Sequence, residues 1–271
     1  MTAVELWTVR TADVPREALR EACDAMLAED ERERARALHF EEDRHEYLVT
    51  RALARVVLGR ALELLPGSLS FRRSEHGRPA LDPPNDVSFN LTNTTELVAL
   101  ALTRGRRVGL DAEPCSHADV ILEVTHSVFS EAERSALARL GAAERRVLAL
   151  RLWTLKEAYI KARGLGLSLA PTAFELETSP GGVALRFLGD VGDDDASGWS
   201  FATLELDGHV ISLCLERGEL ADVEIEVHRA APGALTGGAG HGPVSVRGRG
   251  PGRARRRRPS ARRACSRGPQ G

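Results

Sequence analysis

Lysine is almost absent from this chain of 271 residues. The sequence contains 37 lysine and arginine residues in total, and all but two of them are arginine. The exceptions, Lys156 and Lys161, lie in one short segment, WTLKEAYIKARGLG, residues 153–166. An ammonium group is compact and approaches one oxygen as a point charge, whereas a guanidinium is planar and presents a fork of donors. We therefore interpret both lysines as facing a phosphate or a catalytic carboxylate.

Other absences exclude whole classes of protein. The sequence contains no run of about 18 apolar residues, so we expect no membrane-spanning helix. Its four cysteines are dispersed without a CxxC pair, so neither a zinc site nor a disulfide framework is expected. The N-terminus lacks the charged start and apolar stretch of a signal peptide, and we expect a cytoplasmic protein.

Charge is unevenly distributed along the chain. The formal net charge is −2, but residues 230–271 contain ten arginines and no Asp or Glu, which leaves about −12 on the remainder. This tail is rich in Gly, Pro, Ala and Arg without apolar periodicity, so we predict that residues 230–271 are disordered. A basic tail suits a nucleic acid or an acidic partner, but a solvated segment without a role is the simpler interpretation.

The body of the chain mixes strands and helices without regular βαβ alternation, which indicates an α+β fold. Residues 1–105 and 106–229 each show strands and one long helix, so we predict a pseudo-two-fold pair of similar subdomains. Strands are expected within 3–11, 69–81, 86–93, 97–103, 106–114, 198–206 and 209–216, and helices within 17–40, 42–65, 130–140 and 142–164.

Two carboxylates stand at the end of an apolar strand, VGLDAEP, residues 108–114. Residues i and i+2 of a strand point to the same face, so Asp111 and Glu113 project side by side. Neighbouring like charges repel unless a cation lies between them, and oxygen ligands without nearby His or Cys favour Mg²⁺. Taken alone, a solvent-facing edge strand with two ordinary acids also explains this segment.

The lysine-containing segment is predicted to be helical, and Trp153, Glu157 and Lys161 then share one side of the helix. A surface salt bridge between Glu157 and Lys161 is the simplest explanation, but this chain would be expected to use arginine for such a pair. Glu157 can supply a third metal oxygen. Together with Lys156, these residues describe a site for Mg²⁺ and a diphosphate, where the reaction is a phosphoryl-type transfer.

At these residues the sequence resembles the surfactin-type 4′-phosphopantetheinyl transferases. That family carries G-[IV]-D-[IV]-E and then W-x-x-K-E-x-x-x-K-x-x-G, which read here as GLDAE (109–113) and WTLKEAYIKARG (153–164). Further matches are HFEEDRHEYLVTRALAR (39–55), HGRPAL (76–81), FNLTNT (89–94) and FSEAE (129–133).

The resemblance implies Mg²⁺-dependent transfer of the 4′-phosphopantetheine group from coenzyme A to a serine of an acyl or peptidyl carrier protein, with release of adenosine 3′,5′-bisphosphate. It implies that Asp111, Glu113 and Glu157 hold Mg²⁺. Glu157, or a metal-bound water, would take the proton of the carrier serine, while Lys156 and Lys161 would neutralise the diphosphate and the departing nucleotide.

The resemblance also implies that Arg78, Thr92 and Asn93 line the phosphates of coenzyme A, with Arg36 as a looser candidate for the 3′-phosphate. Position 93 departs from the family, which has His there. Asn can donate a hydrogen bond but has no charge, so we expect weaker coenzyme binding. Glu133 is explained equally by a helix-capping S-x-x-E pattern and by a catalytic role.

Coenzyme A and a carrier protein are therefore the expected partners of a monomeric enzyme that binds no membrane. Two alternatives belong to other classes. The first is a coenzyme A-binding protein without transfer activity, which the intact carboxylate set disfavours. The second is a nucleic-acid-binding protein acting through the basic tail, which the lack of interleaved aromatic residues disfavours.

Overall fold

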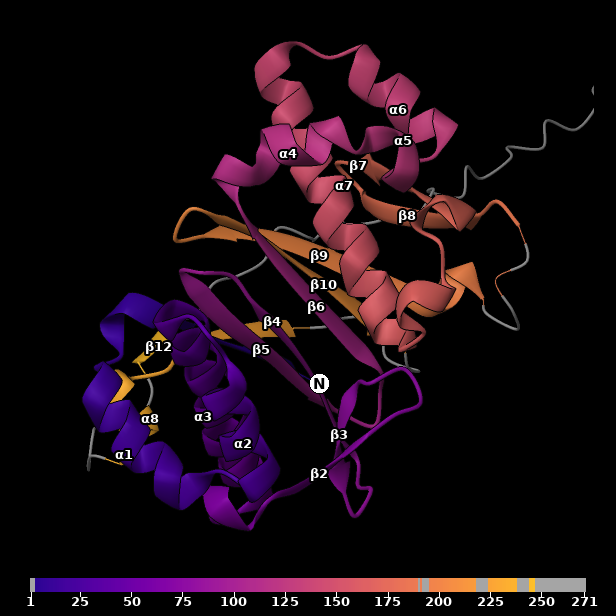
Figure 1. The fold of residues 1–271 in the computed structure, drawn as a ribbon. Coiled ribbons are helices and arrows are strands. Elements are labelled where there is room, and N and C mark those ends of the chain that lie inside the picture. Colours follow the sequence, from indigo (N-terminus) through magenta and orange to yellow (C-terminus); the bar gives the residue numbers. More distant parts are fainter. Residues whose placement is uncertain (1–2, 190, 192–194, 218–223, 238–243, 247–271) are drawn as a thin grey trace, which may run out of the picture.

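The computed structural model describes residues 3–189, 191, 195–217, 224–237 and 244–246 (Figure 1). The elements of the first half are β1 (Ala3–Arg10), α1 (Arg16–Met26), α2 (Glu29–Ala37), α3 (Glu41–Leu62), β2 (Ser70–Arg73), β3 (Pro79–Asp82), β4 (Val87–Asn93) and β5 (Leu97–Arg104). Those that follow are β6 (Val108–Pro114), α4 (Ala118–Glu123), α5 (Thr125–Val128), α6 (Glu131–Ala138), α7 (Ala142–Arg163), β7 (Phe174–Ser179), β8 (Gly182–Phe187), β9 (Trp199–Leu206), β10 (His209–Glu216), β11 (Glu224–Arg229), α8 (Pro232–Leu235) and β12 (Val244–Val246).

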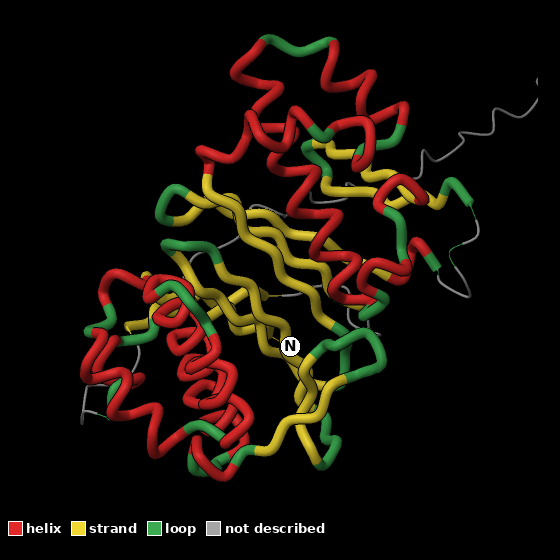
Figure 2. Tube along the Cα trace, viewed as in Figure 1, coloured by secondary structure: helices red, strands yellow, loops and turns green. Residues whose placement is uncertain are grey.

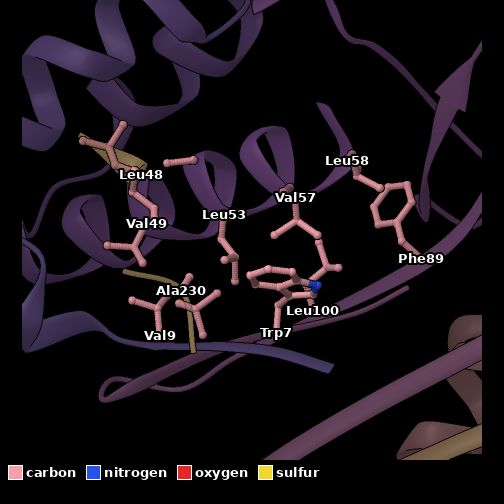
Figure 3. Packing of buried hydrophobic residues seen from close by; sticks show 14 of the residues in the cluster. Trp7, Val9, Leu48, Val49, Leu53, Val57, Leu58, Phe89, Leu100 and Ala230 are labelled. Atoms are coloured by element: carbon pink, nitrogen blue, oxygen red, sulfur yellow. The ribbon is translucent and has the colours of Figure 1, made fainter. Parts of the chain in front are cut away.

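The first half packs α1, α2 and α3 against one face of a sheet with the strand order β12-β11-β1-β5-β4. Alternating residues of β1, Trp7 and Val9, point toward α3, where Leu53 and Val57 meet them (Figure 3). Helix α3 ends at Leu62, and the capping residue Glu63 adopts the left-handed conformation. The long helix is therefore held in place by an apolar core on the inner face of the sheet.

The second half repeats this arrangement with the three-stranded sheet β6-β10-β9 and helix α7, and the hairpin β7-β8 lies beside them (Figure 2). Each half begins with a strand followed by a short 3-10 turn, Thr11–Asp13 or Cys115–His117. Helices and two hairpins follow, and the last strand pairs antiparallel with the first, β5 with β1 and β10 with β6. The predicted α+β class and the pseudo-two-fold pair of halves are thus confirmed.

A buried ion pair is repeated at equivalent positions of the two halves. Arg55 and Lys156 are each the fifteenth residue of a helix of 22 residues, α3 and α7. Arg55 Nη2 lies 2.7 Å from Glu31 Oε2, and Lys156 Nζ lies 2.9 Å from Glu133 Oε2. Both glutamates are the third residue of their helices, α2 and α6. The same frame was therefore built twice, although the two sequences show no clear repeat.

The halves meet where β4 lies beside β6, and apolar residues from both sheets fill the space between them. The Asn90 side chain on β4 accepts a hydrogen bond of 2.8 Å from the Leu110 backbone on β6. On the opposite face of β6, a Cβ atom at Gly109 would lie only 1.9 Å from the Ala158 carbonyl oxygen of α7. Only glycine allows the helix to lie this close to the strand.

The C-terminal segment corrects two expectations. Residues 224–229 were assigned to the second half without a predicted strand, but they form β11, which pairs in parallel with β1 and so extends the sheet of the first half. The predicted disordered tail starts too early at residue 230, because Ala230 and Leu235 are buried in the core of the first half. The arginine-rich part of this tail, 247–271, lies outside the described residues. Within the described part of the chain, no helix is both long and apolar enough to span a membrane.

Candidate active site

The predicted acidic pair lies on β6 and faces helix α7. Leu110 and Ala112 of this strand point into the apolar layer between the sheets, so the alternating residues Gly109, Asp111 and Glu113 point the other way. The side chain of Asp111 is only 8% exposed, compared with 23% for Glu113. The strand therefore presents one buried and one half-buried carboxylate toward the lysine-containing helix.

Three elements converge on the Asp111 carboxylate. Its Oδ1 accepts a hydrogen bond of 2.6 Å from Lys161 Nζ on α7 and a longer one of 3.4 Å from Thr92 Oγ1 on β4. Lys161 Nζ also lies 3.3 Å from Thr92 Oγ1. The second oxygen, Oδ2, is buried and has no hydrogen-bond partner within the described structure. Such an orphaned buried anionic oxygen is costly unless something else binds it.

The carboxylates of this site influence one another's protonation. Burial raises the pKa of the Asp111 carboxyl from 3.8 to about 6; Lys161 opposes this shift, while Glu157 and Glu113 add to it. Burial likewise raises the pKa of Glu157, where Lys161 again acts against the shift and Glu113 with it. The three acids are thus close enough to repel one another, with a single ammonium group among them.

The donor chemistry of the site fits a hard divalent cation. Asp111, Glu113 and Glu157 offer only oxygen atoms, and the orphaned Asp111 Oδ2 needs a positive partner. In the portion of the chain with described coordinates, no three His, Cys, Asp or Glu side chains are already arranged as a metal site. Lys161 is the cation that pairs with Asp111 in this structure.

Glu113 is held at both of its oxygens. Trp153 Nε1 on α7 donates to Oε1 over 3.1 Å. His117, which ends the turn after β6, has its Nδ1 2.9 Å from Oε2. Trp153 was expected on this side of the helix, but His117 was not identified from the sequence. The i,i+4 spacing of Glu113 and His117 is a weak signal, because it becomes a contact only when the chain turns after Pro114.

The structure does not bring Lys156 to this site. Its side chain is fully buried on another side of α7, and Nζ contacts Glu133 Oε2 at 2.9 Å and the carbonyl oxygens of Pro171 and Phe174 at 2.8 and 2.7 Å. An ammonium has three hydrogens to donate, and these three acceptors match them. Contact between Lys156 and a diphosphate is therefore not supported.

Glu133 has the capping role that its sequence pattern allowed. Its side chain accepts from the Ser130 backbone at the start of α6 and from the Leu176 backbone on β7, both over 2.8 Å. Together with the ion pair to Lys156, these bonds tie α6, α7 and β7 together. Glu133 and Lys156 thus stabilise the helix that carries Glu157 and Lys161.

Two predicted phosphate ligands also lie elsewhere. Arg78 is partly buried, and its guanidinium donates to four carbonyl oxygens, those of Lys161, Ala162, Phe89 and Val108, over 2.7 to 3.2 Å. It thereby joins the end of α7 to β4 and β6. Arg36 lies on the exposed side of α2 and pairs with Glu29. Neither side chain is brought to the acidic site.

A cavity of about 360 Å³ lies on the other side of β4 from the acidic site. Thr92 points toward Asp111, whereas its neighbour Asn93 lines the cavity and donates to Glu46. Three arginines that were not identified from the sequence line the same cavity: Arg34, Arg51 and Arg73. Arg51 Nε is buried without a hydrogen-bond partner among the described residues, and burial lowers the pKa of this guanidinium. Asp43 and Glu46 also line the cavity, so the three arginines leave its lining with a net positive charge, which suits an anionic ligand.

The first half provides an internal comparison for the acidic site. By helix position and strand register, Asp111 corresponds to Trp7, Glu113 to Val9, and Glu157 to Val56. Trp7 and Val9 are buried in the core of their half, and Arg60, which corresponds to Lys161, lies over the Trp7 ring. The same frame is thus stable with apolar residues at these positions, so folding does not require the three acids.

The geometry defines an α+β protein of two similar halves, with an acidic site in one half and an arginine-lined cavity beside it. Residues 107–214 match the 4′-phosphopantetheinyl transferase superfamily model, and residues 15–104 match a 4′-phosphopantetheinyl transferase N-terminal model. The gap between these matches falls at the turn between β5 and β6.

Relatives with this description align over most of the chain. A phosphopantetheinyl transferase of Thraustochytrium sp. is 33% identical, and the alignment covers 79% of each chain. The 4′-phosphopantetheinyl transferases HetI of Nostoc sp. and Sfp of Bacillus subtilis are 29% and 28% identical. Their alignments cover 69% and 70% of this chain and 83% and 82% of theirs. The chain belongs to the 4′-phosphopantetheinyl transferase superfamily.

Replacing Lys156 tests its structural role. Lys156→Met leaves Glu133 charged and unpaired in the core, so we expect the free energy of unfolding to fall by about 3–5 kcal/mol. Adding Glu133→Gln should recover part of this loss, because the amide can still accept from the Ser130 and Leu176 backbone. Urea unfolding of the single and double variants measures both effects. If the double variant is no more stable than Lys156→Met, the loss of stability does not come from an unpaired Glu133, and the structural role of the ion pair is contradicted.

The raised pKa of Asp111 predicts a pH dependence of stability. Because the folded chain binds the Asp111 proton more tightly than the unfolded chain, metal-free stability should fall as pH rises from about 4 to about 6. Asp111→Asn removes this contribution and should stabilise the protein at pH 7 by up to roughly 3 kcal/mol, at about 1.4 kcal/mol per pKa unit. Urea unfolding in EDTA at several pH values measures the difference. Parent and variant should converge near pH 4, and a difference that is independent of pH would contradict the assignment.

Proposed function

We propose that this chain transfers the 4′-phosphopantetheine group of coenzyme A to a serine of an acyl or peptidyl carrier protein. Its membership of the transferase superfamily supports the reaction class. The observation that carries the proposal is the acidic site, which exists in one half only. Asp111, Glu113 and Glu157 are placed where the other half has Trp7, Val9 and Val56, and an orphaned buried oxygen persists at Asp111.

Asp111, Glu113 and Glu157 would hold Mg²⁺ in this proposal. When bound, the ion would neutralise the negative charge of the diphosphate. In the reaction, the serine oxygen forms a bond to the phosphorus of the phosphopantetheine arm. The bond from that phosphorus to the bridging diphosphate oxygen breaks, and adenosine 3′,5′-bisphosphate leaves.

Two side chains of α7 have distinct roles in this step. Glu157 would accept the proton of the serine hydroxyl through a carboxylate oxygen that the metal ion leaves free. Lys161 is 30% exposed, and its ammonium can contact an incoming diphosphate as well as Asp111. It would offset the charge that develops on the departing bisphosphate.

The arginine-lined cavity would bind the nucleotide end of coenzyme A. The cavity and the acidic site lie on opposite sides of β4, near its last residues Thr92 and Asn93. A ligand that crosses this end of the strand would contact both. Arg34, Arg51 and Arg73 would contact its phosphate, while Thr92 faces the diphosphate. The positive charge comes from these arginines, so the neutral Asn93 need not supply it.

Mass spectrometry of an apo carrier protein tests the reaction directly. Incubation with the full chain, coenzyme A and Mg²⁺ should add one phosphopantetheine group to the carrier. Glu157→Gln should lower the rate by roughly a hundredfold or more, because the proton acceptor is lost. Glu177→Gln on the exposed surface of β7 is the matched control and should leave the rate unchanged. If neither an acyl nor a peptidyl carrier protein is modified, the proposal is contradicted.

A pair of arginine variants tests the cavity. Arg51→Gln should raise the KM for coenzyme A roughly tenfold with little change in kcat, because one charge-assisted contact to phosphate is lost. Arg36→Gln makes the same chemical change on the exposed side of α2 and should leave KM unchanged. Steady-state kinetics with varied coenzyme A measures both. The reverse result would assign the phosphate to Arg36 on the exposed side of α2 instead of the cavity.

A further inference from the structure

Glu113 is the less buried of the two acids on β6. Its side chain is 23% exposed, and it lies near the end of the strand, where solvent can reach it. A free glutamate at such a position has several rotatable bonds and would sample many orientations. Here both oxygens are engaged, Oε1 by Trp153 and Oε2 by His117. The carboxylate is therefore held in one orientation by donors from two different elements.

The backbone fixes the position of His117. Strand β6 ends at Pro114, and the 3-10 turn Cys115–His117 follows without a linker. The Cys115 backbone N–H donates to the Gly208 carbonyl oxygen over 2.8 Å, which ties this turn to the β9–β10 connection. The sheet thus places the His117 backbone four residues after the carboxylate, while the His117 side chain is 53% exposed and contacts Glu113 from the solvent side.

The first half again supplies a comparison. Its 3-10 turn, Thr11–Asp13, follows β1 as Cys115–His117 follows β6, so Asp13 corresponds to His117. Val9 stands there in place of Glu113. The half without the carboxylate also lacks the histidine, so the fold of the turn does not require an imidazole. The His117–Glu113 contact belongs to the acidic site and not to the shared frame.

We propose that His117 is a positioning residue that restrains the Glu113 carboxylate beside Asp111, so that less ordering of Glu113 is needed when the metal ion binds. This inference rests on the proposed function, because it assigns Glu113 to the metal. His117 does not touch the substrate or the reacting atoms. It acts by donating from Nδ1 to the oxygen that Trp153 leaves free, and a neutral imidazole can make this bond.

Metal binding to the full chain without coenzyme A gives the most direct test. Mn²⁺ serves as the probe, and electron paramagnetic resonance measures the free ion. His117→Ala should weaken Mn²⁺ binding roughly tenfold, as expected when the partner of a metal ligand is lost. Its kcat at saturating Mg²⁺ should stay close to that of the parent, while the Mg²⁺ concentration for half-maximal rate rises. A role in folding alone would not produce this separation.

Two variants control for the loss of an imidazole. His117→Asn keeps a donor close to the Nδ1 position and should restore most of the Mn²⁺ affinity. His126→Ala removes an exposed histidine on α5 and should leave the affinity unchanged. Equal Mn²⁺ affinity in the parent and in His117→Ala would overturn the positioning role alone. A parent chain that binds no Mn²⁺ would overturn the metal site and this inference with it.

Discussion

The close packing of α7 on β6 at Gly109 is the constraint on which the rest of the site depends. No side chain fits there, because even a Cβ atom would overlap the backbone of α7 at Ala158. Because α7 and β6 lie so close together, Lys161 contacts Asp111, the next residue after Gly109 on the same face of β6. Trp153 contacts Glu113, the residue after that on this face. Arg78 strengthens the same contact by joining carbonyl oxygens at the end of α7 to those of β4 and β6.

The two halves use one frame for different purposes. Each fixes its long helix with a buried cation that meets a glutamate in the first turn of the preceding helix, Arg55 with Glu31 and Lys156 with Glu133. The first half then fills the space between strand and helix with apolar side chains, which stabilise it (Figure 3). The second half places carboxylates there, and burial makes their charges unfavourable. The buried ion pair and the apolar core of the second half stabilise the fold enough to offset this local destabilisation.

Local patterns were sufficient to predict most of the strands and long helices, since alternation and helical spacing are properties of short segments. They also placed Asp111 and Glu113 on one face of a strand and Glu157 and Lys161 on one helix. The return of β11 to the first sheet depends on tertiary pairing and has no local signal. Arg51 lies within the matched segment 39–55, but only the cavity that surrounds it distinguishes it from the other arginines of that segment.

The two phosphate-binding roles that the geometry does not support have a common physical explanation. Lys156 and Arg78 were interpreted by charge type, but each is partly or fully buried, and its donors are taken up by acceptors of its own chain. A lysine or arginine in the sequence must find hydrogen-bond acceptors when the chain folds. The sequence alone does not say whether these acceptors belong to the backbone or to a ligand. Burial decides between the two, and burial depends on how α7 rotates against its sheet.

The choice of lysine over arginine at positions 156 and 161 nevertheless has a physical explanation. At Lys156, three acceptors surround a space that matches an ammonium, although Arg55 shows that another arrangement accommodates a guanidinium. At Lys161 the requirement is different. An arginine beside Asp111 would tend to bind both carboxylate oxygens at once through its planar fork. Lysine binds only Oδ1 and leaves Oδ2 without a partner among the residues with described coordinates, so Asp111 can pair with the lysine and still offer an oxygen to a second cation.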